Sequence, residues 1–244
     1  MNRPLALAFF IAILCSPALA AQSTQSAQPD AAAQPQLSAT PTFSQSPTQS
    51  YPRLAGLADQ AIEAQVNKLL ATRERADRTV RTDCLRSYVP RGKPSYSELI
   101  RLTYLSPRLL SIDVRTSSFC GGPYPNDNIP YPMTLDLTTG HELDWRHFFT
   151  NEFLNPPADK PSPLMDLYLR HAALDEDCTN AVNDPSTTFD FWLDSGHKAL
   201  MARPSLLPHA VDVCAKLTPI PFTELQPYVR DPLIRQDLLT PPTP

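Results

Sequence analysis

The feature that most limits how this chain can fold is a set of four cysteines, Cys84, Cys120, Cys178 and Cys214. An even number of cysteines in an exported chain is typical of disulfides, and four cysteines allow three pairings. We predict Cys84–Cys120 and Cys178–Cys214, because each couple lies in one half of the chain and can join neighbouring elements. No CxxC motif is present, which argues against a zinc or redox role. The sequence therefore predicts a fold closed by two disulfides.

The first twenty residues place these cysteines outside the cytoplasm. Arg3 gives a positive start, residues 5–14 are apolar, and residues 18–20 read Ala-Leu-Ala. This is the pattern of a secretory signal peptide cleaved after Ala20, and its apolar run is too short to cross a membrane as a helix. Cys15 would suit a lipid anchor, but Leu14 stands where lipoprotein processing usually needs a small residue. We therefore expect a periplasmic or secreted protein without a membrane span.

Composition divides the remaining chain into a linker and one folded domain. Residues 21–50 are rich in Gln, Ser, Ala, Pro and Thr, and Asp30 is their single charge. Such a segment has too few large apolar residues to offset its ordering entropy by burial, so we predict a disordered linker. We expect a single domain over residues 51–239.

Hydrophobic periodicity predicts helices and antiparallel strands in this domain. Apolar residues from Leu54 to Leu69 recur every three or four positions, which indicates a first helix. Alternating apolar residues on both sides of a Ser-Pro-Arg turn at 106–108 predict a hairpin. The remaining expected elements are a strand at 131–137, helices at 145–153 and 162–174, and strands at 189–193 and 210–217. This order predicts an α+β fold with a mostly antiparallel sheet.

Several landmarks in order resemble a known family. They are Tyr51-Pro52, Gly56-Leu57, Cys120-Gly121-Gly122-Pro123-Tyr124-Pro125, the strand, Asp-Leu-x-Thr-Gly turn and Phe from Leu135 to Phe149, Ile220-Pro221-Phe222-Thr223-Glu224-Leu225 and Tyr228-Val229. Together they are similar to the extracytoplasmic domain shared by the lysozyme-sensing anti-sigma factor RsiV and the accessory region of PdaC-type peptidoglycan deacetylases. The resemblance covers roughly residues 51–229. It implies a curved antiparallel sheet with helices packed on one side.

The chain also departs from that family. Members often carry Tyr-x-Gly-Gly-Ala-His where residues 119–124 here read Phe-Cys-Gly-Gly-Pro-Tyr, so the histidine is missing and any role of it does not carry over. The sequence shows neither the sigma-binding segment and membrane span of the anti-sigma factors nor the catalytic domain of the deacetylases. We therefore expect a sensing or binding module alone.

Four motifs that could signal an active site have simpler structural explanations. The Leu-Asp-Ser-Gly sequence at 193–196 resembles an aspartic protease loop, but it occurs once and suits a turn. Ser195 and His197 are neighbours in that turn, where a nucleophile and its base would point apart. The histidines and the acidic run at 175–177 lack metal-binding spacing. Gly121-Gly122 lacks the Lys-Ser or Lys-Thr of a phosphate loop and suits a bend.

We expect a binding module of the bacterial envelope rather than an enzyme, with no cofactor or metal. The net charge of −4 argues against nucleic acid and fits a cationic partner such as lysozyme, and the resemblance implies the same partner. Cell-wall glycan is the other ligand considered. The candidate binding residues are Tyr124, Asp127, Tyr131, Asp175, Glu176 and Asp177.

Two alternative functions stay open. One is a hydrolase or deacetylase that acts on the cell wall, which would need paired carboxylates or a metal-bound water. The other is a structural envelope protein with no small ligand.

Overall fold

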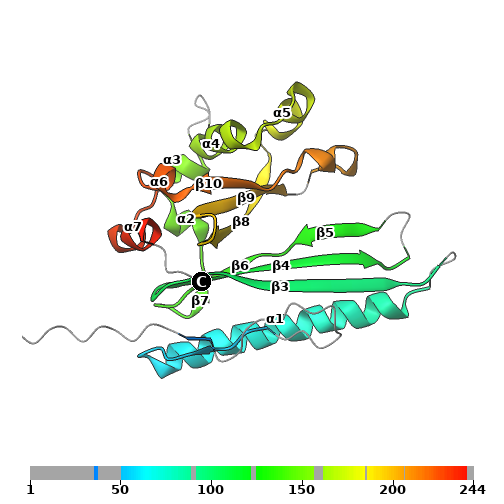
Figure 1. Cartoon of the computed structure of the whole chain (residues 1–244), viewed down its shortest axis with the longest axis horizontal. Helices are drawn as coiled ribbons and strands as arrows, with labels where there is room; N and C mark the ends of the chain where they lie inside the picture. The colour runs from blue at the N-terminus through cyan, green and yellow to red at the C-terminus, as the bar shows by residue number, and fades with distance from the viewer. Residues whose placement is uncertain are drawn as a thin grey trace, which may run out of the picture. The chain divides into compact units, whose positions relative to one another are not determined.

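The strands of this protein form two main antiparallel sheets (Figure 1). The computed structural model describes residues 36–37, 51–88, 92–121, 125–156, 162–184, 186–205 and 207–240. The predicted leader and nearly all of the predicted linker lie outside these residues. The prediction of an α+β class with antiparallel strands is confirmed, although the strands divide between two sheets rather than one.

The first long element is helix α1, Gln60–Arg86, which has 27 residues. It begins where the Asp59 carboxylate accepts hydrogen bonds from the backbone N–H groups of Ala61 and Ile62, at 2.8 and 3.2 Å. The predicted start at Leu54 is wrong, because Gly56 adopts φ 91° between Leu54 and the helix. Leu54 belongs instead to strand β2, Leu54–Ala55, which pairs with β1, Gln36–Leu37.

The large sheet is built on the predicted hairpin. Strand β3, Ser95–Leu105, pairs with β4, Leu109–Phe119, so the prediction at 100–114 is confirmed and each strand is longer than expected. Strand β6, Met133–Asp136, pairs with β4 near the hairpin turn and carries β7, His141–Glu142, on its other edge. Strand β5, Asn126–Pro130, pairs with the other end of β4. We call this other end, which holds Ser95 and Phe119, the distal end.

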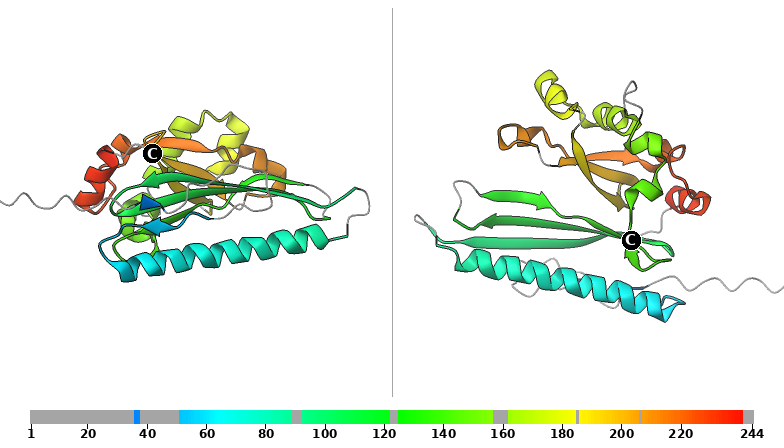
Figure 2. Two further views of the ribbon diagram at one scale, coloured as in Figure 1. Left: turned by 60° about the horizontal axis from the view of Figure 1, so that its bottom comes forward. Right: turned by 180° about the vertical axis from the view of Figure 1, so that it is seen from behind.

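Alternation along β3 and β4 gives the large sheet two different faces. Ile100, Ile112 and Leu135 pack with Val66 and Leu70 of α1 in one buried cluster. The same parity continues along both strands, so α1 covers this face over the length of the hairpin, as both views of Figure 2 show. The opposite face carries the residues of odd number in β3 and β4, except near a bulge at Leu102 and Tyr104.

The small sheet follows the order β10-β9-β8. Its strands are β8, Thr188–Asp194, β9, Ala199–Ser205, and β10, Thr218–Pro221. The strand predicted at 210–217 is wrong, because residues His209–Cys214 form the 3₁₀ helix η1. Val213 is exposed there, so the alternation in the sequence does not mark a buried strand face. The chain joins the sheet just after the predicted range, in β10.

Short helices cover the small sheet and enclose an aromatic core. They are α2, Trp145–Phe148, α3, Asn151–Leu154, α4, Pro163–Ala172, α5, Glu176–Val182, α6, Phe222–Leu225, and α7, Pro232–Leu239. The helix predicted at 162–174 is confirmed, with Ser162 as its cap. The helix predicted at 145–153 is two helices, because Phe149 leaves helical geometry to form a bridge with Val229. Phe148, Phe149 and Phe153 pack there in one ring cluster.

Buried hydrogen bonds join the two sheets. The Ser111 hydroxyl on β4 accepts from the Leu193 N–H of β8 at 3.1 Å and bonds the Thr134 hydroxyl at 2.8 Å. Ser195 donates from both its N–H and its hydroxyl to the Thr103 carbonyl, at 2.8 and 3.1 Å. These groups are buried, so satisfying them fixes the small sheet to the hairpin-turn end of the large one.

The predicted disulfide pairing is confirmed. Cys84–Cys120 joins the last turn of α1 to the end of β4, and Cys178–Cys214 joins α5 to η1. Each closes 36 residues. None of the helices within the described ranges has both the length and the apolar character needed to cross a membrane.

Candidate binding face

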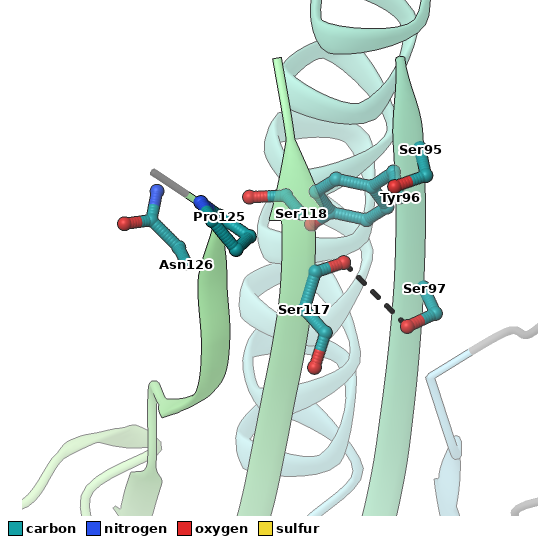
Figure 3. A pocket seen from close by; sticks show the side chains of 7 residues that line it. All are labelled: Ser95, Tyr96, Ser97, Ser117, Ser118, Pro125 and Asn126. Carbon is teal, nitrogen blue, oxygen red and sulfur yellow. Dashed lines mark hydrogen bonds between the residues drawn. The ribbon is translucent and has the colours of Figure 1, made fainter. Parts of the chain in front are cut away.

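A shallow depression lies at the distal end of the large sheet (Figure 3). It has a volume of about 300 Å³ and is lined by Ser95, Tyr96, Ser97, Ser117, Ser118, Pro125 and Asn126. Register places Ser97 directly opposite Ser117, on the face away from α1, and the Ser97 hydroxyl donates to the Ser117 carbonyl at 3.5 Å. The lining therefore presents hydroxyls and one carboxamide, which both donate and accept hydrogen bonds.

Two arginines continue this face toward the hairpin turn. Arg115 follows Ser117 by one alternation, and Arg101 lies opposite Asp113 in the next row. The Arg115 Nε atom donates to the Asp113 Oδ2 atom at 2.8 Å, and Arg101 Nη2 donates to the same oxygen. Asp113 is 0% exposed, while the arginine side chains are 37% (Arg101) and 20% (Arg115) exposed. Two cations therefore share one buried carboxylate, which leaves one positive charge on this face.

The second oxygen of Asp113 is also informative. Among the described residues, its Oδ1 atom has no hydrogen-bond partner although it is buried. A buried carboxylate oxygen without a donor costs free energy, which the ion pairs of the other oxygen with both arginines offset. The carboxylate in turn fixes the positions of both guanidinium groups. We call Ser95, Ser97, Ser117, Arg101 and Arg115 the distal polar face.

The other side of the distal sheet holds a second polar cluster, against α1. The Tyr51 hydroxyl donates to Asp77, and the Arg73 Nε atom lies 3.3 Å from an oxygen of the same carboxylate. Burial raises the pKa of Tyr51, and the hydrogen bond to Asp77 and its charge raise it further. The pKa of Glu98 is raised to about 7, first by burial and then by the charge of Asp77. This end of α1 therefore contacts the sheet through ionisable groups.

Tyr131 is one of the predicted binding residues, and it borders this second cluster. It follows β5 and is half exposed, with the Arg73 guanidinium 5.9 Å from its ring centre. The geometry is that of a cation–π contact. Tyr131 thus has a neighbour within the protein and an exposed edge.

The other predicted binding residues lie elsewhere or outside the described part. Asp175 caps α5 by accepting from the Cys178 N–H at 2.8 Å, and Glu176 and Asp177 are exposed in its first turn. This run lies beside η1, to which the disulfide joins it, whereas Tyr131 contacts α1. Tyr124 and the side chain of Asp127 lie outside the described residues. The predicted set therefore falls on two different regions.

The motifs that resembled active sites have structural roles. Residues 194–198 form the turn between β8 and β9, as predicted, and the Asp194 carboxylate accepts from the His197 N–H at 2.9 Å. The Ser195 hydroxyl is buried and donates a hydrogen bond to the Thr103 carbonyl. Gly121 adopts φ 101° just after β4 ends, which fits the bend predicted there.

Sequence reasoning missed the distal polar face, although a signal for it exists. In Ser95–Leu105, Ser95, Ser97 and Arg101 share one parity, which Leu99 interrupts, and Ile100 and Leu102 share the other. In Leu109–Phe119, Asp113, Arg115 and Ser117 share one parity, while the residues between them change from the apolar Val114 to the polar Thr116 and Ser118. Aligning both strands about the Ser-Pro-Arg turn would have placed these polar residues on one face.

Fold and site together define the class of this protein, a disulfide-closed α+β domain with a polar sheet face. A crystal structure of a member of the DUF3298 family from Bacteroides fragilis has a similar fold, with a TM-score of 0.52 and 12% identity. The match covers 86% of this chain and 98% of that chain. At this identity the likeness shows the fold alone. No family model and no curated protein matches the sequence, so the comparisons do not extend to the RsiV-type family.

Proposed function

We propose that this protein is a non-catalytic binding module of the bacterial envelope, and that its distal polar face binds cell-wall glycan. The observation that carries the proposal is the hydroxyl-lined depression at the open end of the large sheet. Sugars are recognised by groups that donate and accept hydrogen bonds, and the serines and Asn126 supply such groups on two rigid strands and the start of β5. The signal peptide pattern and the two disulfides support a location outside the cytoplasm.

The chemistry of the lining favours binding over turnover. Serine hydroxyls and a carboxamide do not exchange protons near neutral pH, so they orient a ligand without acting as general acid or base. Tyr96 is the titratable side chain in the described lining, and burial and the nearby charge of Glu98 raise its pKa. Tyr96 therefore stays protonated, and its phenol lies on the side of β3 that faces α1, among the charges of Glu98 and Asp77.

A second candidate ligand, a cationic protein such as lysozyme, is supported by a different region. Asp175, Glu176 and Asp177 are three consecutive exposed carboxylates in a chain of net charge −4. Complementary charge speeds association and favours a basic partner. The distal polar face carries the opposite charge, so the two ligands are predicted to use different surfaces.

Filling the depression tests the glycan proposal. Residues 21–244 with both disulfides intact are titrated with soluble peptidoglycan fragments by calorimetry, as wild type and as Ser97→Tyr. Ser97 is exposed in β3, and tyrosine is well tolerated in strands, so the variant should fold while its ring occupies the depression. We expect binding to weaken by at least about tenfold, because several hydrogen bonds are lost.

Thr188→Tyr is the matched control, since Thr188 is an exposed hydroxyl residue on β8 of the other sheet. It should bind as the wild type does. If Ser97→Tyr binds fragments as tightly as the control, the depression is not the site. If the wild type binds lysozyme but no fragment, the function moves to the acidic run of α5.

A further inference from the structure

We infer that Arg101 and Arg115 make the distal polar face selective for glycans that carry carboxylates over neutral glycans. The inference rests on the proposed function and names the ligand class within it. Peptidoglycan has such groups on its stem peptides, and on the lactyl ether of muramic acid wherever no stem peptide is attached. Neutral polymers of N-acetylglucosamine do not.

The two arginines lie within reach of a ligand seated in the depression. Arg115 and Ser117 are two residues apart on one strand, so their side chains leave the same face about 7 Å apart. Arg101 occupies the next row, beside the buried Asp113. A ligand of more than one sugar unit that occupies the depression and extends along the strands therefore meets both guanidinium groups.

Asp113 leaves much of each arginine available. A guanidinium has five N–H donors, and the hydrogen bonds to Asp113 use the Nε atom of Arg115 and the Nη2 atom of Arg101. The two terminal nitrogens of Arg115 are those that form paired hydrogen bonds with a carboxylate. Asp113 is a positioning residue, because it holds both groups in place from beneath and does not neutralise them both.

Burial around the pair strengthens its effect on an anion. Arg115 is 80% buried by the surrounding protein, so its charge is screened less by water and salt than that of an exposed arginine. The rest of the protein is acidic, with a net charge of −4. An acidic ligand therefore gains binding free energy at this face and is repelled elsewhere, which restricts where it docks.

The test compares one acidic and one neutral ligand. Disaccharide fragments of N-acetylglucosamine and N-acetylmuramic acid with free carboxylates are titrated beside chitobiose, into the wild type and Arg115→Met. Methionine keeps the apolar length of the side chain and removes the charge, and Asp113 retains Arg101. We expect the wild type to prefer the acidic fragment, and Arg115→Met to lose about tenfold in affinity for it and little for chitobiose. Arg115→Lys should recover only part of the loss.

Arg78→Met is the control, because Arg78 is an exposed arginine on α1 that also pairs with a carboxylate, that of Glu74. Equal affinity of the wild type for both ligands, or no effect of Arg115→Met, would overturn the inference while sensitivity to Ser97→Tyr keeps the proposed function. The inference would also be overturned if a fragment whose carboxylates are amidated binds as tightly as the free acid. If neither ligand binds and the protein does not co-sediment with cell-wall sacculi, the proposed function fails, and this inference fails with it.

Discussion

The two halves of the interface between α1 and the large sheet are built on different chemistry. Near the hairpin turn, Val66 and Leu70 are completely buried against apolar strand residues. Toward the distal end, Glu98 of β3 faces the charges of Asp77, Arg81 and Arg73 of α1, and the Cys84–Cys120 disulfide closes the end. Asp77 also accepts a hydrogen bond from Tyr51, which precedes β2. Apolar burial therefore stabilises one half, whereas a covalent bond and a polar network hold the other.

This difference explains how the distal sheet can be polar on both faces. A sheet needs at least one face buried against another layer, and apolar residues usually supply the free energy. Here the disulfide confines the last turn of α1 to the end of β4, so the helix covers the distal strands without an apolar stripe. The opposite face is then free to carry Ser97, Ser117 and Arg115, the groups proposed to bind ligand.

The largest expected effect comes from the two disulfides, which offer a matched pair. Replacing Cys84 and Cys120 by serine should lower the free energy of unfolding by about 4 kcal/mol, because loop entropy is restored to the unfolded chain. The Cys178–Cys214 disulfide closes the same 36-residue separation, so replacing both of its cysteines by serine should lower the free energy of unfolding by a similar amount. Urea unfolding measures both.

Hydrogen exchange separates the two disulfide variants. Only the first should increase exchange in residues 77–86 of α1, because only that disulfide holds this half of the helix. Unchanged exchange there would mean that the polar network suffices, and the proposed division of the interface would be wrong.

The next largest effect is expected at the apolar half. Leu70→Ala removes a fully buried side chain and should cost about 3 kcal/mol through lost burial and the cavity left behind. Val80→Ala is the control, since Val80 lies on α1 but is exposed. Thermal or urea unfolding should show little change for the control. Equal losses would contradict the assignment of the apolar contact to the first half of α1.

The smallest effect is a pH dependence at the polar half. The pKa of Glu98 is about 7 in the folded protein against an ordinary value of 4.5. The folded state therefore binds this proton more tightly, and stability falls as the pH rises from about 4.5 to about 7. Asp77 and Glu74 oppose its ionisation from α1, while Arg73 and Arg81 favour it.

Glu98→Gln keeps the shape of the side chain and removes the ionisation. We expect it to be more stable than the wild type at pH 8 by about 1 kcal/mol, a value reduced because the group is partly exposed to solvent. At pH 4.5 the two proteins should differ little. Urea unfolding at both pH values measures this, and a larger gain at pH 4.5 than at pH 8 would reverse the predicted sign.

Much of the fold followed from local patterns. The hairpin at 100–114 was predicted because its signal, alternation about a turn, acts over a few residues, and the helix predicted at 162–174 is α4. The strand predicted at 210–217 is wrong because that prediction also relied on a local pattern alone. Its alternation is real, but residues His209–Cys214 form the 3₁₀ helix η1, in which Val213 is exposed.

The candidate site followed much less from the sequence. Tyr131 was chosen as an aromatic near a Gly-Gly loop, and the structure places it over Arg73, which lies far from it in sequence. The distal polar face depends on the register of β3 with β4 and on which face α1 covers. No short-range pattern in the sequence indicates which face of the large sheet α1 covers.

The sequence by itself showed a signal-peptide pattern, an even number of cysteines and the alternation of the strands, because each depends on residue type and spacing along the chain. The tertiary structure decided where α1 ends, how the strands divide between two sheets, and which polar face stays open. These depend on contacts between distant segments, such as Cys84 with Cys120 and Ser111 with Leu193. Their free energies arise only when the segments meet, so the local sequence does not record them.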